Sequence, residues 1–306
     1  MIRRPLAVSS LVLAAALALA SGAGAQGLRE RFIAHIKEKS AQAQPVDPAQ
    51  YLPGATRAEA AYGTDAAQTI EIYSPPHAQG APVIVMVHGG GWRIGDKNVR
   101  GTVENKLKHW LPQGFVVVSI DYRMLPDAPV DVQARDVAAA VAYVEAHAGD
   151  WGADGNRLIL MGHSAGAHLV SLLSADPARV TAAGGHVWRG TVVLDSAALD
   201  VAHVMTAKHP KLYDDAFGND PAFWASVSPT AQLKPGAVPM MLVCSLKRPD
   251  DSCGQSGAFA ERLKAIGMDA PVVPQPLTHM EINNNLGLGG DYTSTVDGFI
   301  SARLKP

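Results

Sequence analysis

The chain has 306 residues, of which 47% are hydrophobic and 18% are charged. This length and composition suffice for the well-buried core of one large α/β domain. The formal net charge is -2 at pH 7, and no stretch is rich in lysine and arginine. We therefore expect no nucleic-acid partner.

The first 25 residues have the pattern of a signal peptide. Two arginines precede an apolar run over residues 6–20, and small residues suitable for cleavage end at Ala25. We predict cleavage after Ala25 and a mature chain of residues 26–306 that is periplasmic or secreted. An uncleaved membrane anchor is the alternative, but the run is short for a spanning helix, so we expect no stable anchor after cleavage.

Apolar β-rich runs alternate with helical patterns along most of the mature chain. This alternation predicts one domain with a mostly parallel central sheet and helices on both faces. The expected strands are 68–73, 83–87, 115–120, 158–161, 191–194, 240–243 and 272–273, and the main expected helices are 103–110, 130–148, 259–266 and 295–304.

The strand over residues 158–161 ends in Gly162-His163-Ser164-Ala165-Gly166, and an apolar helical run follows. A GxSxG sequence between a strand and a helix is typical of a nucleophile elbow, in which a sharp turn exposes the serine oxygen. The alternative is a glycine-rich turn whose serine caps the helix. We interpret Ser164 as a nucleophile.

A second glycine-rich turn follows the apolar strand over residues 83–87. Three successive glycines occupy positions 89–91, although one would suffice for a flexible turn, which is the alternative interpretation. We predict that the N–H groups of Gly90, Gly91 and Ala165 form an oxyanion hole. Trp92, directly after the glycines, is a candidate wall of the substrate pocket.

A catalytic serine needs a histidine base and an acid that orients it. His279 lies after the last expected strand and before the closing helix, which fits the chain order serine, acid, histidine. Asp250 and Asp251 follow the expected strand 240–243, and Asp195 follows the strand before it. We favour Asp251, then Asp250, and place Asp195 last.

The two cysteines, Cys244 and Cys253, flank these aspartates. In an oxidising compartment such a pair is a disulfide candidate, and two separate buried thiols are the alternative. The segment 196–234 is short and polar, so we expect a small cap that could cover a pocket without forming a large lid. Trp224, within it, is a second candidate pocket wall.

These motifs together resemble the α/β-hydrolase superfamily, in particular its hormone-sensitive-lipase-like and arylformamidase-like esterases. The matching pieces are His279 and the segments HGGGW (His88–Trp92), DYRMLP (Asp121–Pro126), GHSAG (Gly162–Gly166) and FGNDPAFWASVSP (Phe217–Pro229). The resemblance implies an eight-stranded sheet, a Ser-His-Asp triad and no metal or other cofactor. The loop after strand 240–243 is longer than is usual in this group.

The resulting hypothesis is an exported serine esterase that acts on a small-molecule ester, either short-chain or of the aryl type found in plant walls. An arylformamidase-type amide hydrolase is the first alternative, although export disfavours it. A catalytically silent binding module with this fold is the second, and the intact serine, histidine and glycines argue against it. We make no prediction about the oligomeric state.

Overall fold

The structure is a computed structural model that describes residues 44–305. The predicted signal peptide lies outside the described residues. The described residues belong to a single compact unit. Among them, no helix is both long and apolar enough to cross a membrane.

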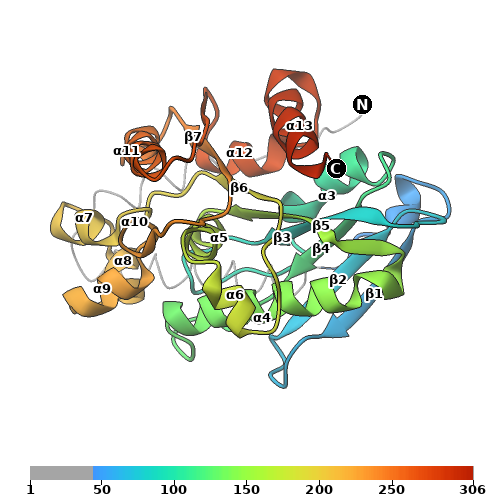
Figure 1. The fold of residues 1–306 in the computed structure, drawn as a ribbon, viewed down its shortest axis with the longest axis horizontal. Helices are drawn as coiled ribbons and strands as arrows, with labels where there is room; N and C mark the ends of the chain where they lie inside the picture. Colours follow the sequence, from blue (N-terminus) through green and yellow to red (C-terminus); the bar gives the residue numbers. More distant parts are fainter. Residues whose placement is uncertain (1–43, 306) are drawn as a thin grey trace, which may run out of the picture. The chain divides into compact units, whose positions relative to one another are not determined.

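An eight-stranded sheet forms the centre of this unit, in the order β1-β2-β4-β3-β5-β6-β7-β8 (Figure 1). The pairings β1·β2 and β2·β4 are antiparallel, and all the others are parallel. This is the predicted α/β-hydrolase fold, and that prediction is confirmed. The strands are β1 (Thr56–Ala61), β2 (Thr69–Ser74), β3 (Ala81–Val87), β4 (Val116–Ile120), β5 (Ala153–His163), β6 (Gly190–Leu194), β7 (Met240–Ser245) and β8 (Val272–Gln275).

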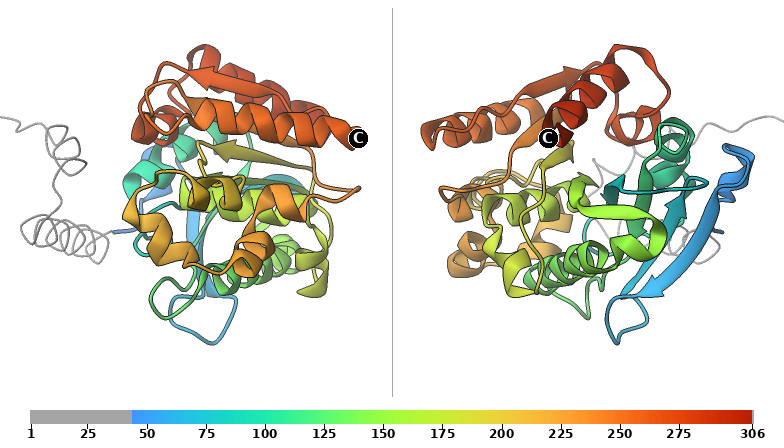
Figure 2. Two further views of the ribbon diagram at one scale, coloured as in Figure 1. Left: turned by 90° about the vertical axis from the view of Figure 1, so that its left-hand side faces the viewer. Right: turned by 45° about the vertical axis from the view of Figure 1, so that its right-hand side comes forward.

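The central strands are apolar throughout because both faces of the sheet are covered. Along β3, Val83, Val85 and Val87 belong to one hydrophobic cluster, whereas Ile84 and Met86 belong to another. Successive strand side chains point to opposite faces, so these clusters are the two cores of the unit. Figure 2 shows helices over both faces of the sheet.

The helices α4 (Val130–His147), α5 (Ala165–Ala175) and α11 (Ser252–Ala265) contribute to the first cluster. The helices α3 (Arg100–Trp110), α12 (His279–Asn285) and α13 (Gly290–Leu304) contribute to the second. Trp110 of α3 is completely buried there, and its Nε1 donates to Asp297 at 3.0 Å. The remaining short pieces near the main body are η1 (Pro48–Gln50), η2 (Ala148–Trp151) and α6 (Ala178–Ala182).

The segment predicted as a small cap folds into short helices beside α5 (Figure 1). They are α7 (Val201–Thr206), α8 (Lys211–Phe217), α9 (Pro221–Val227) and α10 (Pro229–Gln232). Asp200 and Asp220 start α7 and α9 by accepting backbone N–H groups, as helix N-caps do.

Candidate active site

Ser164 occupies the sharp turn between β5 and α5. Its φ is +57°, and its N–H donates to the carbonyl of Leu194 at 3.0 Å. The flanking glycines are required because a Cβ on Gly162 would lie 2.4 Å from the carbonyl oxygen of Gly166, and one on Gly166 would lie 2.3 Å from that of Val87. The packing of this turn therefore accounts for the GxSxG pattern.

His279 is the first residue of the short helix α12, which lies between β8 and α13. Thr278 and Glu281 form a capping box that fixes the start of this helix. The Nε2 of His279 lies 2.9 Å from Ser164 Oγ. The buried ring of His163 contacts the backbone carbonyl of His279 at 2.9 Å, and burial holds the pKa of His163 well below its ordinary value, so it is a neutral donor.

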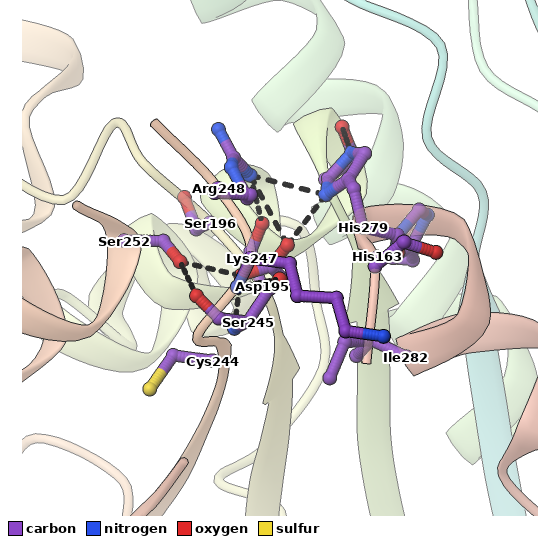
Figure 3. Close-up of polar contacts among 12 residues, drawn as sticks. His163, Asp195, Ser196, Cys244, Ser245, Lys247, Arg248, Ser252, His279 and Ile282 are labelled. Atoms are coloured by element: carbon purple, nitrogen blue, oxygen red, sulfur yellow. Dashed lines mark hydrogen bonds and ion pairs between the residues drawn. The ribbon is translucent and has the colours of Figure 1, made fainter. Parts of the chain in front are cut away.

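Asp195 is the carboxylate that reaches the histidine (Figure 3). It follows β6 directly, is fully buried, and its Oδ2 lies 2.6 Å from His279 Nδ1. Its Oδ1 accepts the N–H of Ser245 at 2.8 Å and the hydroxyl of Ser252 at 2.7 Å. Burial alone would raise the pKa of Asp195, but the hydrogen bond from His279 and the charge of Arg248 outweigh burial and lower it.

The prediction that Asp251 or Asp250 would pair with His279 is wrong. Asp251 turns away into the first turn of α11, where its carboxylate accepts the N–H of Gly254 at 3.0 Å as an N-cap. Asp250 instead forms a two-bond ion pair with the guanidinium of Arg248. Both aspartates follow β7, but the path of the chain there directs them toward Gly254 and Arg248 and away from His279.

The glycine loop lies against the serine. A Cβ on Gly89 would lie 2.8 Å from Ser164 Cβ, and Gly90 and Gly91 have φ values of +127° and +60°. In the described part of the chain, the N–H groups of Gly90, Gly91 and Ala165 have no hydrogen-bond acceptor. Three unpaired donors are therefore available beside the nucleophile, two of them from this loop and one at the start of α5.

Trp92 is a core residue, which corrects its prediction as a pocket wall. It is only 3% exposed, it packs against the rings of His168, Tyr213 and Phe217, and its Nε1 donates to His168 Nδ1 at 3.2 Å. The contact with His168 packs the glycine loop against α5, and the contacts with Tyr213 and Phe217 pack it against α8 of the cap. Trp224 is partly exposed on α9, and its Nε1 donates to the carbonyl of Phe217 at 3.1 Å.

Residues 245–252, from the end of β7 to the start of α11, supply three site residues that no sequence pattern indicated. Ser245, Arg248 and Ser252 all contact Asp195, and the predicted disulfide between Cys244 and Cys253 closes this loop. The cysteine spacing was the one available sign that this loop is structurally special. Among residues 44–305, no cluster of histidine, cysteine or acidic side chains could hold a metal ion.

Comparison with known proteins places this arrangement in a family. The family model described as BD-FAE matches residues 70–263, which is more than half of the chain. A probable isoprenylcysteine alpha-carbonyl methylesterase of Arabidopsis thaliana is 32% identical over 111 residues, covering 36% of this chain and 23% of that protein. Esterase LipC of Mycobacterium tuberculosis is 26% identical over 231 residues, covering 67% of this chain and 54% of that protein.

The chain thus aligns with about a quarter to a half of the length of these relatives. Among solved structures, esterase B from Lactobacillus rhamnosis has a TM-score of 0.67 at 20% identity, covering 96% of this chain and 94% of that one. That similarity establishes the common fold. Together with the extent of the family match, it shows that the chain belongs to the BD-FAE family of α/β-hydrolases.

Proposed function

We propose that this chain is an exported serine hydrolase that cleaves carboxylic esters by two-step acyl transfer. The observation that carries the proposal is the continuous contact from Ser164 Oγ through His279 to Asp195, at 2.9 and 2.6 Å. The ionised carboxylate of Asp195 can only accept a hydrogen bond, so the neutral imidazole of His279 must carry its proton on Nδ1. The other ring nitrogen, Nε2, is then free to accept a proton.

In the first step, His279 takes the hydroxyl proton of Ser164 as the oxygen attacks the ester carbonyl. The negative charge that develops on the carbonyl oxygen is stabilised by the free N–H groups of Gly90, Gly91 and Ala165. The imidazolium then gives its proton to the departing alcohol, and the acyl group stays on Ser164. The charge of Asp195 stabilises the imidazolium while it exists.

In the second step, a water molecule loses its proton to His279 and attacks the acyl-enzyme. The same three N–H groups stabilise the second tetrahedral species, and the proton returns to Ser164 as the acid leaves. One lost oxyanion donor would cost about 3 to 4 kcal/mol of transition-state stabilisation. Both steps use the same three side chains and the same three N–H groups.

The names of the relatives support an ester as the substrate, since they include a methylesterase, an esterase and a carboxylesterase. For this chain we propose short-chain esters or esters of the aryl, plant-wall type. The signal-peptide pattern before residue 26 and the disulfide support export to an oxidising compartment.

The test is hydrolysis of p-nitrophenyl esters of increasing acyl length, with N-formylkynurenine as a competing substrate class. Wild type should turn over the esters and react covalently with a fluorophosphonate, and Ser164→Ala should do neither. Ser171→Ala is the matched control, because it removes another hydroxyl from the same region, one that donates only to the carbonyl of Ala167. Preference for the formamide would favour the amide hydrolase, and no turnover or labelling would contradict the proposal.

A further inference from the structure

Arg248 is a largely buried cation placed directly beside the Asp195–His279 pair (Figure 3). Its Nη1 donates to the backbone carbonyl of Asp195 at 2.9 Å and lies 3.3 Å from the Oδ2 atom of that carboxylate. The same Nη1 lies 3.0 Å from His279 Nδ1. Because Nδ1 carries a proton that it donates to Asp195, the two N–H groups are neighbouring donors that converge on one oxygen.

Asp250 holds the other side of this guanidinium. The Nε of Arg248 donates to Asp250 Oδ1 at 2.8 Å, and its Nη2 donates to Asp250 Oδ2. A two-bond pair of this kind fixes the plane of an arginine side chain. The guanidinium therefore has a defined orientation toward Asp195, and Asp250 partly neutralises its charge.

A fixed positive charge this close to an imidazole opposes the uptake of a second proton by that imidazole. This matters for the proposed reaction, because His279 becomes positively charged each time it accepts the proton of Ser164. Removing Arg248 would favour the imidazolium, and removing Asp250 would disfavour it. The two members of the pair thus have opposite effects on the same group.

Other polar groups lie on the elements around His279. On α3, the buried cation Lys106 donates to Asn283 of the same helix as His279, and on α13 the buried Tyr292 lies near Asp195. The others are Ser164 and the neutral His163 at the end of β5, Asp195 after β6, Tyr213 of α8 beside Arg248, Lys247 of the same loop and Glu281 of α12. Burial raises the pKa of Tyr213, so it stays neutral. Lys247 and Glu281 are about half exposed, and solvent screens them.

Resting on the proposed hydrolase function, we propose that Arg248 and Asp250 form a positioning pair that orients Asp195 and sets the pH range over which His279 acts as a base. Arg248 is not a catalytic residue, since it acts through the carboxylate and the imidazole. Both Arg248 and Asp250 lie in the loop that the disulfide closes. The same loop provides Ser245 and Ser252, which hydrogen-bond to Asp195.

The experiment measures the pH dependence of kcat/KM and, separately, the NMR titration of the His279 imidazole, which is assigned by its absence in His279→Gln. Arg248→Met should raise the acidic pKa in both measurements, because it removes the positive charge beside the imidazole. Asp250→Asn should lower it, and Arg248→Lys, which keeps the positive charge but loses the two-bond pair with Asp250, should shift it less than Arg248→Met. Lys247→Met is the matched control, since it removes an exposed cation from the same loop and should change neither measurement.

Thermal unfolding of each variant confirms that the comparison is made on folded protein. If Arg248→Met does not fold, Asp250→Asn still tests the sign of the effect. Shifts of the same sign in Arg248→Met and Asp250→Asn, no shift in either, or an equal shift in Lys247→Met would overturn the proposal. The NMR titration decides this even if no ester is hydrolysed, so failure of the hydrolase function would be recognised separately.

Discussion

Replacing Asp195 with asparagine tests the assignment of the acid directly. The asparagine oxygen would stay with the N–H of Ser245 and the hydroxyl of Ser252, which turns its NH₂ group toward His279. The imidazole would then have to accept at Nδ1 and carry its proton on Nε2, facing Ser164. In that tautomer it cannot take the serine proton, and comparable changes in serine hydrolases lower kcat by about 10⁴-fold.

Such a loss corresponds to about 5 kcal/mol of transition-state stabilisation, which steady-state hydrolysis of a p-nitrophenyl ester resolves easily. Asp251→Asn is the matched control. Asparagine is as good an N-cap as aspartate, so the cap on α11 survives and kcat should remain within a few-fold of wild type. A large loss in Asp251→Asn together with an active Asp195→Asn would refute the assignment of Asp195 as the acid.

Three further predictions concern stability. Burial lowers the pKa of Lys106 to about 7, so the unfolded chain binds more protons between that pH and 10.5, and stability should rise with pH across this window. Lys106→Met should flatten that rise in urea unfolding measured at several pH values, and an unchanged slope would contradict the shift. Gly166→Ala should lower Tm strongly or abolish folding, because its Cβ would meet a backbone oxygen of β3, whereas Gly257→Ala, in open space on α11, should stabilise by up to about 1 kcal/mol. Removing the disulfide with Cys244→Ala and Cys253→Ala should lower the free energy of unfolding by about 2 to 3 kcal/mol and also lower kcat, and an unchanged kcat would show that the closed loop does not support Asp195.

Local sequence patterns were sufficient for the fold, and they indicated Ser164 and the glycine loop as candidate site residues. The alternation of apolar runs reflects burial on both faces of the sheet, and the glycines around Ser164 are required by contacts within a few residues or with the adjacent strand. His279 was predicted as the base from chain order alone. That order follows from the topology, because β8 is the last strand and its end leads back to the edge where Ser164 lies.

The acid could not be chosen from the sequence because two strands end at the same edge with aspartates after them. Distance in the sheet gives a partial reason for the outcome, since β6 lies next to the elbow strand β5 and β7 lies one strand further away. The final choice depends on the direction of the β7–α11 loop, where Asp251 turns back to cap a helix. No local pattern records that direction.

No sequence pattern indicated Arg248, and Trp92 was wrongly predicted to face a pocket. Both outcomes have a related reason. Their roles come from partners far away in the chain: Asp195 for the arginine, and His168 and Phe217 for the tryptophan. A tryptophan after a glycine loop has the same appearance in the sequence whether it faces a pocket or the core. Only the packing of the cap against α5 decides between the two.

The acid and the loop that surrounds it belong to different strands, and this separation has an evolutionary consequence. Asp195 directly follows β6, whereas Ser245, Arg248 and Ser252, which also hydrogen-bond to it, come from residues 245–252, between the end of β7 and the start of α11. Mutations in that segment can accumulate without replacing any of the three residues assigned to the chemistry. Changes in this segment would therefore alter the pH dependence of the proposed reaction while leaving the three assigned residues unchanged.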